Sequence, residues 1–356
     1  MKYVLIYAIF LMLVFQTSCG QNKTNVPQDN IKSSTANYSE SQLKEADTSR
    51  VPMSMVRNVK QARNGDILIA STLAVFRYDG KSFTNLTSNL TSSKIGSHRF
   101  WDVLEDRRGN LWFASTDSSV YYYNGKSFQH FTTKEGLASN MVMSIYEDKA
   151  GNIWFGGGGL SRYDGTSFQN FTTKDGLPRN DRSAIMEDKT GKLWIATGDG
   201  PCFYDGKTFT VLKDKDGKSF RNVSSIIEDK KGNIWFGVNG GRVNGLWRYD
   251  GSTFTNVSQR GVYAIVEDKK GNIWATGQVN PGGDGSVWAL SRYDQKSLYN
   301  IKPTVTEIMS SRGTALLGLL EANDGSIWFG GAGLQSGVYR YDGKTITDFR
   351  RKEDQK

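Results

Sequence analysis

One short pattern returns seven times along this chain and limits the fold more than any other feature. Each copy has a glycine, a polar residue, Ile or Leu and then Trp, with 39 to 54 residues between successive glycines. Repeats of this length indicate propellers or stacked arrays, because a single unit cannot bury its apolar face alone. The complete copies are Gly109-Asn110-Leu111-Trp112, Gly151-Asn152-Ile153-Trp154, Gly191-Lys192-Leu193-Trp194, Gly232-Asn233-Ile234-Trp235, Gly271-Asn272-Ile273-Trp274 and Gly325-Ser326-Ile327-Trp328, and a degenerate first copy is Gly65-Asp66-Ile67-Leu68.

A second signature follows in every copy: a tyrosine and then Asp or Asn, with Gly next in all but the sixth copy, where Gln295 stands. Asp-Gly and Asn-Gly favour tight hairpins, because both residues accept positive φ at little cost. Each repeat is therefore expected to hold short strands joined by hairpins. In the third repeat the expected strands are 142–147, 153–156, 160–163 and 167–172.

Four antiparallel strands per unit, without helical periodicity, predict an all-β chain that folds as a seven-bladed β-propeller over residues 51–350. An open solenoid would need polar caps at its ends, but the first and last copies keep the common pattern. The six repeated tryptophans are expected to pack between neighbouring blades. Paired carboxylates such as Glu147-Asp148 could serve acid–base catalysis, but they recur from copy to copy, which favours a role in the turns.

The beginning of the chain is typical of an export signal. Lys2 precedes an apolar run, Val4 to Phe15, that is too short to span a bilayer. Cys19 follows in a segment that resembles a bacterial lipobox, which predicts a signal peptide at 1–18 and lipidation of Cys19; a plain signal peptide is the alternative. Residues 19–50 are polar and predict a flexible tether, and 351–356 form a charged tail.

Composition excludes several classes of function. The net charge of +9 is spread over many lysine-bearing turns, so the footprint of a nucleic-acid-binding protein is lacking. Without a metal-spaced His or Cys cluster, we expect no metal and no cofactor. Cys202 is expected to be a small packed side chain, and a membrane is expected to hold the chain only through the N-terminal lipid.

The string Ser144-Ile145-Tyr146-Glu147-Asp148-Lys149-Ala150-Gly151-Asn152-Ile153-Trp154-Phe155-Gly156, with Leu160-Ser161-Arg162-Tyr163-Asp164-Gly165 after it, resembles the two-component regulator propeller repeat. The resemblance covers residues from about 51 to 350. It implies a periplasmic sensor of the kind found in hybrid histidine kinases, often a detector of carbohydrate breakdown products. Since no kinase domain follows Phe349, the expectation is a sensor-like propeller on its own.

A ligand is expected on the face that carries the links from second to third strands and from fourth strands to the next blade, because the longest loops collect there. These loops are 87–100, 238–245, 276–289 and 301–313. Polar residues at the start of each inner strand are expected to form a rim for hydroxyls or carboxylates, and a solvated rim without a ligand is the alternative. The candidate residues are His98, Arg99, Trp101, Asn140, Asn180, Arg182, Arg221, Arg260, Trp288 and Arg312.

The expected function is recognition of an oligosaccharide or a partner protein of the cell envelope, with the chain on the periplasmic side of the outer membrane and no catalytic residues. One alternative is an enzyme that resembles the streptogramin lyases, which are propellers that use histidine and a divalent metal. The two histidines of this chain, His98 and His130, are not expected to meet in one site. The other alternative is an envelope scaffold protein.

Replacing the lipidated cysteine tests the anchoring hypothesis. We expect Cys19→Ser to abolish incorporation of a labelled fatty acid and to move the protein into the soluble fraction, because the thiol is the acylated group. Metabolic labelling followed by fractionation measures both effects. An unlabelled wild-type chain would support the plain signal peptide instead.

Overall fold

The computed structural model describes residues 51–91, 98–181, 184–240, 244–280 and 287–352, all within one compact unit, 39–356. They form seven antiparallel sheets, each made of four consecutive strands. The predicted seven-bladed β-propeller is therefore confirmed. Cys19 and Arg182 lie outside the described residues. Among the described residues, helix is confined to short segments, and none has the length and apolarity to cross a membrane.

The strands follow one another blade by blade. Blades 1 to 4 are β1 (Val56–Gln61), β2 (Ile67–Ser71), β3 (Val75–Tyr78) and β4 (Phe83–Asn85); β5 (Phe100–Glu105), β6 (Leu111–Ser115), β7 (Val120–Tyr123) and β8 (Phe128–Phe131); β9 (Val142–Glu147), β10 (Ile153–Gly157), β11 (Gly159–Tyr163) and β12 (Phe168–Phe171); β13 (Ala184–Glu187), β14 (Leu193–Thr197), β15 (Gly200–Tyr204) and β16 (Phe209–Val211). Blades 5 to 7 are β17 (Val223–Glu228), β18 (Ile234–Val238), β19 (Gly245–Tyr249) and β20 (Phe254–Ser258); β21 (Ala264–Glu267), β22 (Ile273–Gln278), β23 (Val287–Tyr293) and β24 (Val305–Arg312); β25 (Thr314–Glu321), β26 (Ile327–Gly333), β27 (Gly337–Tyr341) and β28 (Ile346–Asp348). The helical segments are α2 (Ser88–Thr91), η1 (Thr173–Asp175) and η2 (Phe349–Lys352).

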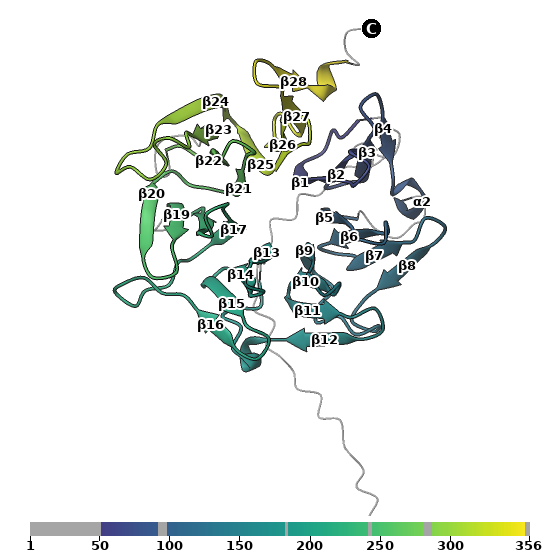
Figure 1. Ribbon diagram of the computed structural model, residues 1–356. Coiled ribbons are helices and arrows are strands. Elements are labelled where there is room, and N and C mark those ends of the chain that lie inside the picture. Colours follow the sequence, from purple (N-terminus) through teal and green to yellow (C-terminus); the bar gives the residue numbers. More distant parts are fainter. Residues whose placement is uncertain (1–50, 92–97, 182–183, 241–243, 281–286, 353–356) are drawn as a thin grey trace, which may run out of the picture. The chain divides into compact units, whose positions relative to one another are not determined.

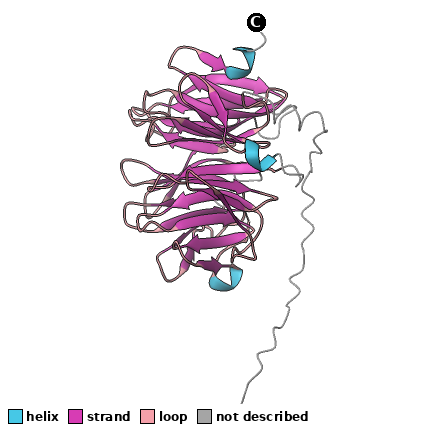
Figure 2. Ribbon diagram, turned by 90° about the vertical axis from the view of Figure 1, so that its right-hand side faces the viewer, coloured by secondary structure: helices cyan, strands magenta, loops and turns pink. Residues whose placement is uncertain are grey.

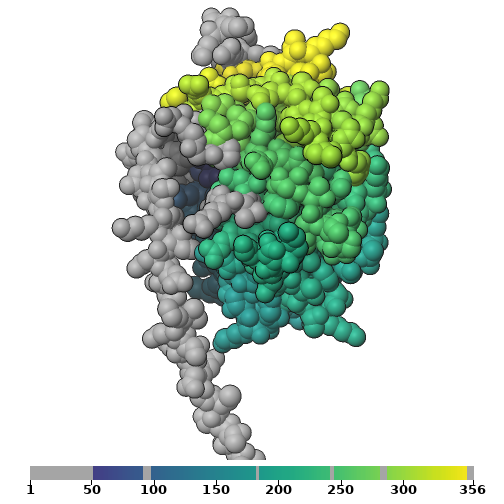
Figure 3. All heavy atoms as spheres, turned by 90° about the vertical axis from the view of Figure 1, so that its left-hand side faces the viewer, coloured from purple at the N-terminus to yellow at the C-terminus, as the bar shows by residue number. Residues whose placement is uncertain are grey.

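The first strand of each blade lies nearest the centre of the ring (Figure 1). A side view shows the strands running between the two faces of the ring (Figure 2). In the space-filling view the blades follow one another in chain order, from teal through green to yellow (Figure 3). We call the face with the hairpins between first and second strands the turn face. The opposite face, with the β2–β3-type links and the links between blades, is the loop face.

The repeated tryptophans join neighbouring blades, as predicted. All six are buried, with at most 4% of the side chain exposed. Most of them contact the tyrosine that ends the third strand of the next blade: the ring centroids of Trp112 and Tyr163 are 5.9 Å apart, and those of Trp154 and Tyr204 are 6.2 Å apart. Trp328 of the last blade contacts Tyr78 of the first at 5.5 Å, which closes the ring. Burial of large aromatic rings at every junction contributes strongly to stability.

In blades 2 to 6 a buried aspartate in the turn between the first two strands holds the indole. Asp188 Oδ2 accepts a hydrogen bond from Trp194 Nε1 at 2.7 Å, and Asp229 Oδ2 accepts one from Trp235 Nε1 at 2.7 Å. The other carboxylate oxygen accepts turn N–H groups, such as Lys192 N to Asp188 Oδ1 at 3.0 Å. The predicted turn role of the Glu-Asp pairs is therefore confirmed for the aspartates, because a buried carboxylate needs such partners.

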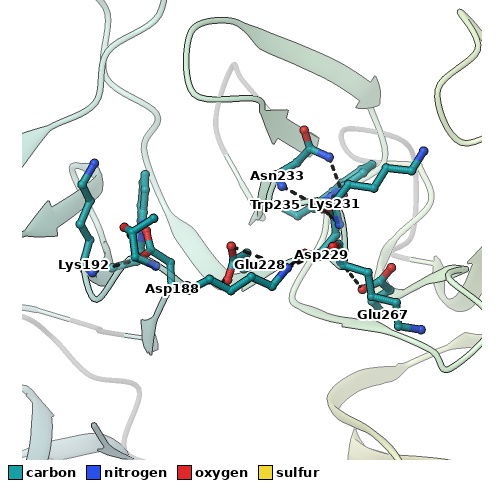
Figure 4. Close-up of polar contacts among 12 residues, drawn as sticks. Asp188, Lys192, Glu228, Asp229, Lys231, Asn233, Trp235 and Glu267 are labelled. Atoms are coloured by element: carbon teal, nitrogen blue, oxygen red, sulfur yellow. Dashed lines mark hydrogen bonds and ion pairs between the residues drawn. The ribbon is translucent and has the colours of Figure 1, made fainter. Parts of the chain in front are cut away.

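The glutamate of each pair links two blades. Glu228 of blade 5 accepts a hydrogen bond from the backbone N–H of Lys189 in blade 4 at 2.9 Å, and Lys189 Nζ donates to the carbonyl of Asp229 at 3.0 Å. Figure 4 shows Glu228 between the Asp188 and Asp229 turns. The same carboxylate-to-backbone bond, which we call the clasp, joins Glu105 to Arg63, Glu147 to Arg107, Glu187 to Lys149, Glu267 to Lys230 and Glu321 to Lys269.

Blades 7 and 1 are joined without exchange of a strand among the described residues, so side chains form this seam. Its clasp is neutral: Gln61 Oε1 accepts the N–H of Asn323 at 2.8 Å. Phe349 stacks on Trp328 at 5.2 Å and meets the edge of Tyr78. Gly318 has φ of +40°, and a Cβ atom there would lie 2.9 Å from the carbonyl oxygen of Arg57, so the two inner strands approach closely.

Two of the loops expected on the loop face, 276–289 and 301–313, differ from the prediction, because strands of blade 6 extend into them: β22 and β23 enter the first, and β24 takes up 305–312 of the second. Residues 301–304 belong to the β23–β24 link at the turn-face end of the blade, so their expected place on the loop face is wrong. Trp288 pairs with Gln278 and Ser311, and Val287 pairs with Arg312. The prediction that Trp288 belongs to an extended loop is therefore wrong, and Arg312 ends an outer strand. Small and polar residues hide the alternation of apolar and polar side chains that marks a strand in these segments. Only the backbone pairing shows that they are strands.

The turn aspartates predict a pH-dependent stability. Burial by itself would raise the pKa of Asp188, but hydrogen bonds from Trp194, Thr190 and Lys192 outweigh it and lower the pKa. A carboxyl with a lower pKa in the folded than in the unfolded state stabilises the fold at pH values above its unfolded pKa. This stabilisation is lost as pH falls, here from about 5 to about 3. We expect Asp188→Asn to cost about 2 kcal/mol at neutral pH, with a smaller difference from wild type near pH 3.

Urea denaturation at both pH values measures this difference. Asp216→Asn, in an exposed turn of the same blade, is the matched control and should change stability little. An Asp188→Asn penalty that stays constant down to pH 3 would contradict the assignment.

Candidate ligand-binding site

The inner strands share an irregularity near the loop face. In β1, β5, β9 and β17 the pairing with the second strand skips one residue, which forms a β-bulge at the same register. A bulge takes a residue out of the ladder and re-aims its side chain, and such bulges are frequent beside functional sites. The bulged residues are Arg57, Trp101, Met143 and Ser224.

Tyr263 occupies the same register in blade 6, directly before β21, where its N–H donates to the Thr276 carbonyl at 2.7 Å. The equivalent residue of blade 4, Ser183, lies outside the described residues. We call the five side chains Arg57, Trp101, Met143, Ser224 and Tyr263 the bulge ring. All five are half-buried. Their chemistry differs from blade to blade on one repeated backbone, so packing of the blades does not require it.

Aromatic and cationic groups gather at two places in the bulge ring. The guanidinium carbon of Arg57 lies 3.8 Å from the centroid of the Trp101 ring, across the junction of blades 1 and 2. Tyr263 meets Trp288 edge to face, with centroids 6.4 Å apart and an interplanar angle of 62°. Such surfaces offer apolar ring faces with polar edges, which suits planar or ring-shaped ligands.

A polar network joins the inner strands at the position directly after the bulge ring. Asp102 is buried, and its carboxylate accepts hydrogen bonds from Asn58 Nδ2 at 2.8 Å, Lys60 Nζ at 2.9 Å and the backbone N–H of Ile145 at 2.8 Å. Its charge is therefore compensated by Lys60 and it ties blades 1, 2 and 3 together. Nearby in sequence, the buried hydroxyl of Ser144 has no hydrogen-bond partner among the described residues.

The predicted polar rim proves largely structural. His98 is buried, and its Nδ1 lies 2.8 Å from Ser118 Oγ, in the β6–β7 link, while Nε2 lies 3.3 Å from the carbonyl oxygen of Leu90. At the same register Ser54 Oγ accepts the N–H of Leu73, and Thr314 Oγ1 accepts the N–H of Gln335. These side chains fix the loops of their own blades, which removes His98 from the surface.

The two rim asparagines hold the links between blades. Asn140 Oδ1 accepts the N–H of Thr133 at 2.9 Å and the hydroxyl of Ser119 at 2.9 Å, and Asn180 Oδ1 accepts the N–H of Thr173 at 3.1 Å. A side-chain acceptor that satisfies loop N–H groups is a turn-stabilising feature. Their oxygens are thus engaged in the fold.

The arginines of the predicted rim differ in their contacts and exposure. Arg260 forms an ion pair with Glu307 at 2.7 Å, and the backbone N–H of Arg99 donates to Asp117. Arg221 and Arg312 are exposed. Of the ten predicted residues, the structure therefore brings Trp101 into the bulge ring and sets Trp288 beside Tyr263, while Arg182 lies outside the described residues.

The two histidines contact the same ring, that of Tyr121. His130 stacks on Tyr121 with centroids 4.4 Å apart, His98 meets the edge of the same ring at 5.5 Å, and His130 Nε2 lies 2.7 Å from the carbonyl oxygen of Ser118. His98 is buried and His130 is exposed, and the expectation that they do not meet in one site stays a prediction. Over the described part of the chain, no three His, Cys, Asp or Glu residues are grouped to hold a metal ion.

Sequence reasoning aligned the inner strands but missed Arg57, Met143, Ser224 and Tyr263 as a set. The signal was available, since an alignment of the inner strands puts all four at one position, directly before a small or polar residue. It was overlooked because a regular strand would place that residue in the ladder. Only the bulges single it out.

The buried histidine generates a test of its role. We expect His98→Ala to destabilise the fold by about 2–4 kcal/mol, because a buried ring and its two hydrogen bonds are lost. The exposed His130→Ala is the matched control and should cost less. Thermal and urea denaturation measure both variants. Loss of ligand binding by His98→Ala at unchanged stability would restore His98 to the recognition surface.

Comparison with solved structures shows the fold. The chain is similar to virginiamycin B lyase from Staphylococcus aureus, with 13% identity, coverage of 82% of this chain and 96% of that one, and a TM-score of 0.62. It is similar to YCF48 from Cyanidioschyzon merolae, with 14% identity, 82% and 96% coverage and a TM-score of 0.56. With the extracellular domain assigned to the hybrid two-component system BT3049 of B. thetaiotaomicron, identity is 17% and the TM-score 0.54; 82% of this chain matches 52% of that one.

The repeats themselves match a family model. No curated protein sequence matches the chain. The model of the two-component regulator propeller matches residues 94–117, 136–159, 176–199 and 217–240. Each match runs from the link before a blade through its first two strands, which is the part that holds the clasp and the indole bond. The chain therefore carries two-component regulator propeller repeats in its second to fifth blades.

Proposed function

We propose that this protein is a ligand-recognition propeller of the sensor type, without a catalytic activity of its own, and that the bulge ring receives the ligand. The observation that carries the proposal is the variation at this one register. In the same blades the position before it holds an apolar residue and the position after it a small or short polar one, whereas the bulge ring presents Arg, Trp, Met, Ser and Tyr. Unrepeated side chains on a rigid repeated scaffold are typical of a binding surface.

A carbohydrate is the ligand class that the chemistry favours. Trp101 and Tyr263 supply aromatic surface, and Ser224 and Arg57 supply hydrogen-bonding groups that suit hydroxyls. A partner protein of the cell envelope is the other ligand that this surface could take. Export and attachment through a lipidated Cys19 belong to the same proposal, since an envelope sensor must face extracytoplasmic ligands.

A lyase-like activity is the second candidate, because solved lyases share the fold, including a catalytically inactive histidine-to-alanine variant of virginiamycin B lyase bound to quinupristin. Against it, both ring nitrogens of His98 are engaged inside blade 2. Incubation of the chain with quinupristin, followed by mass spectrometry, tests this candidate directly. Cleavage that depends on His98 or His130 would replace the binding proposal.

Removal of aromatic surface from the bulge ring tests the main proposal. We expect the wild-type chain to bind members of a glycan array, and Trp101→Ala and Tyr263→Ala to weaken binding at least ten-fold, about 1.4 kcal/mol each. Tyr299→Ala, an exposed aromatic residue on the turn face, is the control and should bind as wild type does.

Affinity capture from envelope extracts runs in parallel with the array. Capture of one protein in a Trp101-dependent way, with no glycan bound, would favour a protein partner. Glycan or protein binding that survives both bulge-ring substitutions in folded protein would refute the site.

A further inference from the structure

We infer that Arg57 is an anion-recognition residue of the bulge ring, so that the ligand carries an oxyanion, a carboxylate, sulfate or phosphate, that meets the guanidinium edge. The inference rests on the proposed function, which it narrows to a class of ligand. It starts from the contacts that the Arg57 side chain makes and lacks.

Arg57 has no polar partner among the described residues. No ion pair or side-chain hydrogen bond engages it there, and its Nε is shielded from solvent without an acceptor. Its guanidinium carbon lies 3.8 Å from the centroid of the Trp101 ring. The ring supplies no acceptor oxygen, so the terminal N–H groups keep their donors. In a guanidinium these donors form a planar fork that matches the two oxygens of a carboxylate or phosphate.

Arg57 differs from the other arginines that lie near a tryptophan ring. Arg162 and Arg292 also have a shielded Nε, and their guanidinium carbons lie 5.9 Å from Trp154 and Trp274. They occupy one repeated position of the third strand, so the blades themselves account for them. Arg57 is unrepeated, because the same register holds Trp101, Met143, Ser224 and Tyr263 elsewhere. The blade therefore needs no arginine at this position.

The local charge favours an anion. The nearest carboxylate along the neighbouring strand, Asp102, accepts hydrogen bonds from Lys60, Asn58 and two backbone N–H groups. Lys60 balances its negative charge, so the positive charge of Arg57 remains uncompensated. The stack on Trp101 also holds the guanidinium in place before binding, which limits the loss of side-chain entropy when an anion arrives.

The bulge takes Arg57 out of the ladder. The pairing of β1 with β2 passes from Val56 to Asn58, and Arg57 lies between them. The inner strand of blade 7 lies directly beside the backbone here, since a Cβ at Gly318 would lie 2.9 Å from the Arg57 carbonyl oxygen. Gly318 therefore places no side chain against the backbone of Arg57.

Paired probes separate the charge from the ring of the ligand. The full chain is titrated by calorimetry with a uronic-acid disaccharide, with the neutral disaccharide of the same sugar ring, and with inorganic phosphate. The variants are Arg57→Gln, Arg57→Lys and Arg108→Gln. Arg108 is exposed in the turn between β5 and β6, on the turn face, so its replacement changes the net charge equally and controls for long-range attraction.

The inference expects the uronic-acid disaccharide to bind at least ten-fold more tightly than its neutral counterpart, with that advantage lost in Arg57→Gln and kept in Arg108→Gln. Arg57→Lys should recover only part of it, because an ammonium lacks the planar fork. Arg57-dependent binding of phosphate, with the sugar ring adding nothing, would support the anion and assign it to a free oxyanion.

Equal weakening by Arg57→Gln and Arg108→Gln would overturn the inference, as would the absence of saturable binding of both anionic probes up to ~10 mM. Equal affinity for neutral and acidic disaccharides in wild type and Arg57→Gln would overturn it too. That last result leaves the proposed ligand-recognition function standing, whereas loss of all glycan and protein binding in the array and capture experiments removes the function itself.

Discussion

The bond between a buried turn aspartate and the tryptophan indole is the constraint on which the blades depend. It fixes the hairpin between the first two strands, satisfies a carboxylate in a dry setting and places the indole against the next blade. The two blades beside the seam depart from it. Blade 1 has Ala62 and Leu68 at these positions, and in blade 7 the hydroxyl of Ser326 takes the hydrogen bond from Trp328. These blades rely on apolar packing instead.

Closure of the ring follows from the same asymmetry. Between the other blades, a glutamate binds the preceding turn and a basic side chain spans the junction, whereas the seam has Gln61 and Asn323. The aromatic group of Trp328, Tyr78, Phe83 and Phe349 makes up for the missing charges. Phe349 comes from η2, after the last strand, so the end of the repeat region completes the first blade's packing. A neutral aromatic seam also avoids the cost of desolvating another ion pair.

In the proposed function, recognition and stability use different positions of the inner strands. Val56 and its counterparts pack, Asn58, Asp102 and Ser225 at the next-but-one position form hydrogen bonds between blades, and the bulged residue between the two positions differs from blade to blade. The rim at the start of each strand looked equally suited to binding in its polarity, but its side chains hold loops. Polar character alone does not distinguish a side chain that satisfies its own backbone from one that waits for a ligand.

The sequence by itself determined the repeat, the strand count of a blade, the propeller fold and the role of the six tryptophans, because these depend on local patterns that recur. Tertiary structure decided which polar residues are engaged, that both histidines contact Tyr121, and that Trp288 is in a strand. It also singled out Arg57, since a bulge is a mismatch between two paired strands and has no signature in either strand alone.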